Sequence, residues 1–163
     1  MTGKTPILII GLGNRYRRDD GVGLLVAEKI RASNYDGVKV VDGISDGAAL
    51  METWSEAEKV FIIDAVKFGA SQAAVYRFDA LRENLPGEIF SRNSTHSFNL
   101  IESIELAKSL RKLPHSLVIY GIKGYDFSSG VGLTPDVKNA ALDVINRLKG
   151  EIENIMGYKV EEH

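Results

Sequence analysis

Short, strongly apolar segments alternate along this chain with segments that space their apolar residues as a helix does. This alternation predicts strands joined by helices, and therefore a largely parallel sheet with helices on both faces. The predicted strands are residues 6–13, 38–43, 59–66, 74–80 and 116–124. We therefore expect an α/β fold, a three-layer α/β/α sandwich around a mostly parallel five-stranded central sheet. The connection between Asp64 and residue 74 is short for a helical crossover, which favours an antiparallel fourth strand.

Helix-start signals stand between these strands. One helix is predicted from Gly21, and a second over 46–57 with Asp46 as its N-cap. Thr134 and Pro135 open the last helix, with threonine as N-cap and proline at the first helical position.

A further helix is predicted after the polar connection 81–95. Ser94 or Thr95 can cap it. Its inward face would carry Leu100, Ile101, Ile104, Ala107 and Leu110.

Length and composition indicate one globular domain, residues 1–163, with 44% hydrophobic and 26% charged residues. The net charge of −2 gives no general attraction to nucleic acid or anionic membranes, and the absence of cysteine excludes thiolate sites. The apolar run near the N-terminus is too short for a signal peptide or a membrane span. We expect a cytoplasmic, monomeric enzyme or binding domain without nucleic-acid or membrane partners.

Three side chains suited to metal binding or acid–base chemistry stand where predicted elements meet. Asp20 follows the first strand, Asp64 ends the third, and His96 lies where the long connection meets a helix. Because parallel strands share the edge at which they end, the two carboxylates can converge there. Two carboxylates and an imidazole suit a divalent transition metal, nickel or zinc rather than magnesium.

Each residue also has an ordinary structural explanation. Asp20 before Gly21 can cap the following helix, and His96 can be a solvated residue at a helix start. Asp64 is harder to explain in this way, because an unpaired carboxylate at the end of a buried strand is costly. Spacing alone leaves both interpretations open.

Residues 11–23, GLGNRYRRDDGVG, do not form a complete phosphate-binding motif. They lack the lysine and the serine or threonine of a P-loop, and Tyr16 stands where a dinucleotide-binding loop has its third glycine. The chain also has no His-Glu-x-x-His or Gly-x-Ser-x-Gly motif. Arg15, Arg17 and Arg18 can contact an anionic group, but a solvated basic loop is the simpler explanation.

Taken together, several segments resemble the hydrogenase maturation endopeptidases, which process the large subunit of nickel–iron hydrogenases. They are GLGNRYRRDDGVG (11–23), VVDGISDG (40–47), FIIDAV (61–66), STHSFNL (94–100) and VGLTPDV (131–137). The resemblance implies that Asp20, Asp64 and His96 are the metal-ligating and catalytic residues. It also implies removal of a C-terminal extension from the large-subunit precursor after nickel insertion, with nickel presented by the precursor rather than permanently bound.

The chain departs from the family pattern at two places. Many members have glutamate where Asp20 stands, and the shorter side chain would move the metal or require a closer backbone. The usual Asp-Gly-Gly-Thr after the second strand is Asp42-Gly43-Ile44-Ser45 here, and the bulk of Ile44 bears on substrate selectivity.

Two alternative functions stay open. Peptidyl-tRNA hydrolases also begin with a strand and Gly-Leu-Gly-Asn, but Arg15-Tyr16 and Asp19-Asp20 replace the residues that family expects, including its catalytic base. The second alternative is a non-catalytic protein that binds the precursor in a nickel-dependent way.

If the chain is a protease, the loops 81–95 and 124–133 are candidates for binding the C-terminal tail of the precursor.

Overall fold

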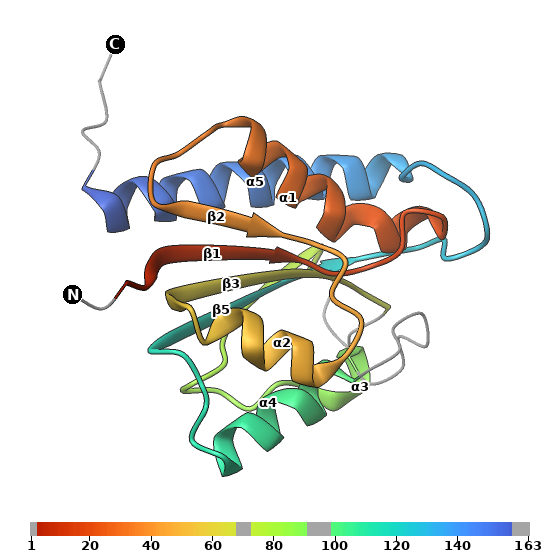
Figure 1. The fold of residues 1–163 in the computed structure, drawn as a ribbon. Coiled ribbons are helices and arrows are strands. Elements are labelled where there is room, and N and C mark those ends of the chain that lie inside the picture. Colours follow the sequence, from red (N-terminus) through yellow and green to blue (C-terminus); the bar gives the residue numbers. More distant parts are fainter. Residues whose placement is uncertain (1–2, 68–72, 91–98, 158–163) are drawn as a thin grey trace.

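The computed structural model describes residues 3–67, 73–90 and 99–157 (Figure 1). The strands are β1 (Thr5–Gly11), β2 (Val38–Val41), β3 (Ala57–Val66), β4 (Val75–Asp79) and β5 (Ser116–Lys123). The helices are α1 (Val22–Ala32), α2 (Gly47–Trp54), α3 (Gly87–Phe90), α4 (Leu100–Ser109) and α5 (Pro135–Met156), and a 3-10 turn, η1 (Arg18–Gly21), precedes α1.

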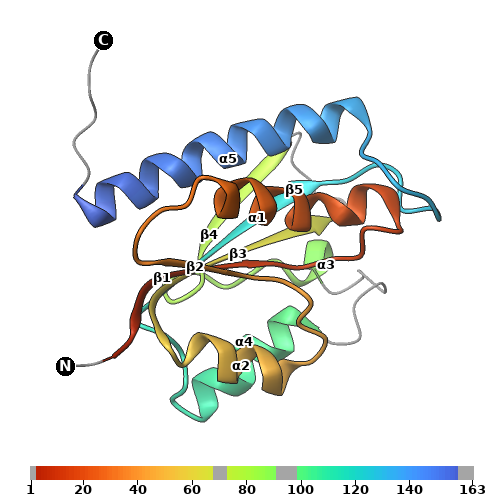
Figure 2. The same cartoon turned by 45° about the horizontal axis from the view of Figure 1, so that its top comes forward.

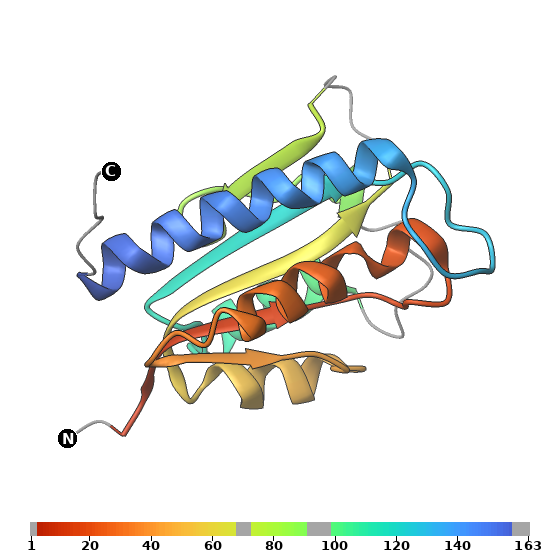
Figure 3. The same ribbon diagram turned by 90° about the horizontal axis from the view of Figure 1, so that it is seen from above.

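The described strands form one sheet in the order β2-β1-β3-β5-β4, with the parallel strands side by side in Figure 3. β1 pairs in parallel with β2 and β3, and β3 pairs in parallel with β5. Among the described strands, β4 alone is antiparallel, and it pairs with β5 at the edge of the sheet. The predicted mostly parallel sheet with an antiparallel fourth strand is confirmed.

Helices cover both faces of the sheet, α1 and α5 on one side and α2, α3 and α4 on the other (Figures 1 and 2). Successive residues of a strand point to opposite faces. In β1, Ile7 and Ile9 therefore pack in the core beneath α1 and α5, whereas Leu8 and Ile10 pack beneath α2 and α4. Because both faces are buried, β1 is apolar at successive positions instead of alternating with polar residues.

Helix α4 begins later than its sequence pattern predicts. The side chain of Asn99 caps it by accepting hydrogen bonds from the backbone N–H groups of Ile101 (2.9 Å) and Glu102 (3.3 Å). The predicted caps, residues 94 and 95, lie outside the described residues. Leu110 was predicted to face inward, and this is wrong: α4 ends at Ser109, and Leu110 is 50% exposed beyond the last turn.

The long helix α5 is held against the sheet by a hydrogen-bonded group. The hydroxyl of Tyr120 in β5 donates to the carboxylate of Glu151 in α5, and the guanidinium of Arg77 in β4 donates to the same carboxylate. Tyr120 is almost fully buried, and this burial, reinforced by the Glu151 carboxylate, raises its pKa from 10.0 to about 12. No described helix, α5 included, is long and apolar enough to cross a membrane.

The raised pKa of Tyr120 predicts a loss of stability at alkaline pH. The folded state favours the neutral phenol, so its contribution is complete below pH 10.0 and is lost as the pH rises toward 12. We expect Tyr120→Phe to remove this dependence, so that the wild type loses about 2 kcal/mol of unfolding free energy relative to the variant over that window. Urea unfolding of both proteins from pH 8 upward measures this difference in unfolding free energy. A difference that stays constant with pH would contradict the prediction.

Candidate active site

The edge at which the parallel strands end carries the loops with the predicted chemistry. β1 runs into a first loop, residues 12–21, which includes η1, and β5 runs into a glycine-rich loop, residues 124–134. Both loops lie at the same end of the sheet in Figure 3. A cavity of about 530 Å³ lies at the opposite edge, between the C-terminal ends of α2 and α4, and neither predicted carboxylate lines it. The candidate site therefore lies at the end of the sheet that carries these loops, which we call the loop edge.

Asp64 stands near the end of β3 and is 2% exposed. Its register partner in β5 is Gly121, while the preceding residue, Ile63, is the partner of Gly11 in β1. The backbone N–H of Leu12 then donates to the carbonyl oxygen of Ile63 at 2.9 Å. The first loop therefore leaves the sheet directly beside Asp64.

Asp20 lies in η1, is 0% exposed, and does not cap the following helix. The N-cap of α1 is Gly21, which makes no side-chain capping bond. Instead, Oδ2 of Asp20 accepts a hydrogen bond from the backbone N–H of Asn14 at 2.8 Å. The capping interpretation is thus wrong, because the carboxylate turns back toward the start of its own loop.

Close backbone packing brings η1 onto the end of β3. A Cβ atom at Gly23, in the first turn of α1, would lie 2.4 Å from the carbonyl oxygens of both Leu12 and Ile63. Only glycine permits this approach, and η1 itself contacts β3. Asp20 and Asp64 are thereby carried on neighbouring segments at one edge, as parallel topology predicts.

The third predicted ligand, His96, lies outside the described residues. Within residues 3–67, 73–90 and 99–157, no three histidine, cysteine or acidic side chains group as metal ligands. Of the three predicted site residues, only Asp20 and Asp64 lie among the residues that the structure describes.

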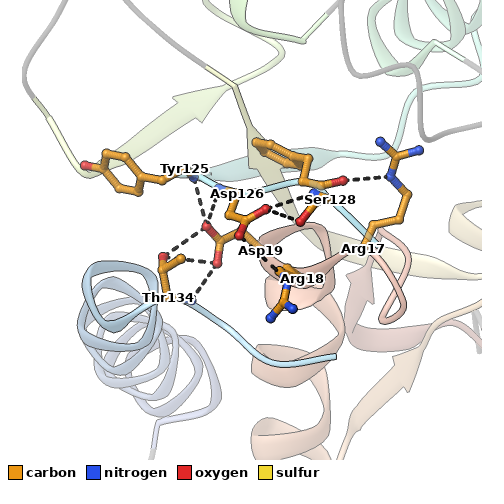
Figure 4. Close-up of polar contacts among 8 residues, drawn as sticks. Arg17, Arg18, Asp19, Tyr125, Asp126, Ser128 and Thr134 are labelled. Atoms are coloured by element: carbon orange, nitrogen blue, oxygen red, sulfur yellow. Dashed lines mark hydrogen bonds and ion pairs between the residues drawn. The ribbon is translucent and has the colours of Figure 1, made fainter. Parts of the chain in front are cut away.

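Asp19, for which the sequence pattern predicts no role, joins the two loops (Figure 4). It is fully buried, and its carboxylate accepts hydrogen bonds from the backbone N–H groups of Tyr125 (2.9 Å), Asp126 (2.9 Å) and Thr134 (2.8 Å). The Thr134 hydroxyl also donates to it, at 3.0 Å to Oδ2. Thr134 does occupy the predicted N-cap position of α5, but its side chain binds Asp19 instead of capping the helix.

The arginines of the first loop also contact protein groups. Arg15 forms an ion pair with Glu28 at 3.0 Å, and Nε of Arg17 donates to the carbonyl oxygen of Phe127 at 3.2 Å. Arg18 lies 3.7 Å from the carboxylate of Asp126. Ser128 donates two hydrogen bonds to Asp126 and, with Arg18, lowers its pKa below the usual value. These arginines therefore brace the loops.

Comparison with known proteins assigns a family to this arrangement. The model of the hydrogenase maturation protease family matches residues 24–151. A Methanocaldococcus jannaschii protein provisionally named as a hydrogenase maturation protease is 29% identical over 159 residues, 92% of this chain and 98% of that protein. The hydrogenase 2 maturation protease of Escherichia coli is 24% identical over 136 residues, 81% of this chain and 81% of that protein.

A solved structure agrees with the fold. An endopeptidase from Escherichia coli superposes with a TM-score of 0.77 over 91% of this chain and 93% of the other, at 20% sequence identity. The family match spans the segment from α1 to α5, so it includes Asp64 and the glycine-rich loop. The chain therefore belongs to the hydrogenase maturation protease family and is a peptide-bond hydrolase.

Proposed function

We propose that this chain, a cytoplasmic monomer, removes the C-terminal extension of a nickel–iron hydrogenase large-subunit precursor after nickel insertion. Asp20, Asp64 and His96 engage the nickel that the precursor presents. The observation that supports this most directly is the pair of buried carboxylates, Asp20 and Asp64, carried on adjoining segments at the loop edge.

The two carboxylates and the imidazole proposed as ligands suit a cation that the substrate supplies. Two buried carboxylates on adjoining segments supply negative charge at one edge of the sheet. A divalent cation brought to this edge is attracted by that charge. Carboxylate and imidazole ligands together fit nickel better than magnesium, which favours oxygen ligands alone. The enzyme needs no permanently bound metal in this scheme, because its substrate carries one.

Two roles are open to these residues during peptide hydrolysis. Precursor-bound nickel supplies Lewis acidity, which favours attack on a nearby peptide carbonyl or lowers the pKa of the attacking water. In the first role, the carboxylates orient the nickel-bearing segment so that the scissile bond lies at the loop edge. In the second, one carboxylate takes a proton from the attacking water as general base.

The loops beside the carboxylates offer apolar contacts to a peptide. Tyr16 of the first loop is 66% exposed, and Tyr125 and Val131 of the glycine-rich loop are 55% and 69% exposed. A shallow cavity of about 200 Å³ lies between the loops and α1, where its lining includes Arg15 and Val131. Exposed loop residues at a strand-end edge are typical substrate contacts, and we assign the precursor's tail to this surface.

A mass measurement tests the proposal. The precursor is a nickel-loaded, C-terminally extended hydrogenase large subunit. A neighbouring reading frame that encodes a large subunit with paired Cys-x-x-Cys motifs would identify it. We expect incubation with the chain to shorten it by one C-terminal fragment, while the same precursor without nickel stays at full length. Nickel-dependent binding with no change of mass would instead indicate a non-catalytic binder. If a cognate precursor is neither bound nor shortened, the proposal is refuted.

A further inference from the structure

The carboxylate of Asp19 is a buried junction of three chain segments. Asp19 belongs to η1, Tyr125 and Asp126 follow β5, and Thr134 precedes α5. All contacts described for its carboxylate are donors: three backbone N–H groups and one hydroxyl. The backbone N–H of Asp19 in turn donates to the carbonyl oxygen of Asp126 at 3.0 Å. The bonding is therefore reciprocal.

Further bonds join the same two loops on either side of this junction. The N–H of Arg18 donates to the carbonyl oxygen of Gly130 at 3.0 Å, and the N–H of Gly130 donates to the carbonyl oxygen of Tyr16 at 2.9 Å. The first loop and the glycine-rich loop thus form one hydrogen-bonded unit with the Asp19 carboxylate inside it (Figure 4).

We propose that Asp19 is a positioning residue for the protease site, an inference that rests on the proposed function. Asp19 and Asp20 are consecutive in one 3-10 turn, and their carboxylates bind opposite neighbours: Asp19 the glycine-rich loop, Asp20 the N–H of Asn14. Because the two residues are consecutive, the bonds that hold the Asp19 carboxylate also hold the backbone of Asp20. One of these bonds holds the exposed Tyr125 next to the turn that carries Asp20. The bonds of Gly130 with Arg18 and Tyr16 do the same for the residue before the exposed Val131.

The expected effect of loosening this junction is on turnover more than on precursor binding. A displacement of about 1 Å at a reacting group costs roughly 100-fold in rate, although it leaves most substrate contacts intact. Asp19→Asn keeps the shape of the side chain but turns an NH₂ group toward N–H donors, so at least one bond is lost. We expect kcat to fall about 10- to 100-fold while KM changes less than about threefold.

A second substitution guards against simple misfolding. Thr134→Val removes the hydroxyl donor and keeps the backbone N–H, so we expect an intermediate loss of kcat, and Thr134→Ser restores the donor and the rate. Trp54→Phe is the stability control, because Trp54 is buried and its Nε1 donates to the carbonyl oxygen of Lys112 (2.9 Å) at the opposite edge of the sheet. At a temperature where all variants are folded, we expect this control to keep the wild-type kcat.

Amide hydrogen exchange supplies a readout that does not need activity. We expect Asp19→Asn to speed exchange in residues 14–21 and 124–134, and Trp54→Phe to leave these segments unchanged. A folded Asp19→Asn with wild-type kcat, or with wild-type exchange in residues 14–21, would overturn the inference. A wild-type chain that cleaves no precursor would refute the proposed function alone, since the exchange experiment still decides whether Asp19 holds the turn that carries Asp20.

Discussion

Asp20→Asn and Asp64→Asn are each expected to lower the rate of precursor processing by about 10³-fold or more. Asparagine keeps the shape of aspartate but loses the negative charge that attracts a divalent cation. Since both side chains are buried, removing the charge also removes a desolvation penalty. We therefore expect folded variants whose loss is chemical. The time course of the precursor's mass measures the rate, and thermal unfolding verifies that each variant is folded.

Asp143→Asn is the matched control for these substitutions. Asp143 lies in α5, where its exposed carboxylate forms an ion pair with Arg147 at 3.0 Å. An exposed pair of this kind contributes little to stability, so we expect an unchanged rate and an unchanged unfolding temperature. Wild-type processing by either Asp20→Asn or Asp64→Asn would contradict the assignment of that carboxylate to the site.

The sheet was predictable because its signals are local. β1, β3 and β5 each contain an uninterrupted apolar run, and the short connection after Asp64 indicated the antiparallel direction of β4. The start of α4 was not predictable with the same accuracy. Ser94, Thr95 and Asn99 are all good capping residues, and the local pattern does not say which one the tertiary packing selects.

Predictability of the site divides in the same way. Asp20 and Asp64 could be placed at one edge because strand direction and order determine where strands end. Asp19 could not be assigned, because its partners Tyr125, Asp126 and Thr134 lie 106, 107 and 115 residues away in the sequence. Thr134 is an example. From the sequence, its hydroxyl could equally cap a helix or bind a distant carboxylate, and in the structure it binds the buried Asp19.

Gly13→Ala is expected to lower the free energy of unfolding by about 4 kcal/mol or more, and to displace Asp20. Gly13 has φ +132°, a conformation that residues with a side chain rarely adopt. A Cβ atom there would lie 1.9 Å from the carbonyl oxygen of Asp20, far inside van der Waals contact. Because that oxygen belongs to the backbone of η1, relief requires moving the turn that carries the carboxylate.

Gly132→Ala separates backbone strain from the clash with Asp20. Gly132 has φ +112°, but a Cβ atom there would meet nothing within 4 Å, so alanine carries only the conformational penalty of about 1–3 kcal/mol. Urea unfolding of both variants measures the difference, which we assign to contact between Gly13 and the turn. An equal decrease in the free energy of unfolding in the two variants would mean that η1 moves away from the new Cβ atom without a cost in stability. In that case the contact between Gly13 and the carbonyl oxygen of Asp20 would not fix the position of Asp20. Its position would depend on the hydrogen bond from the Asn14 N–H and on the bonds of Asp19.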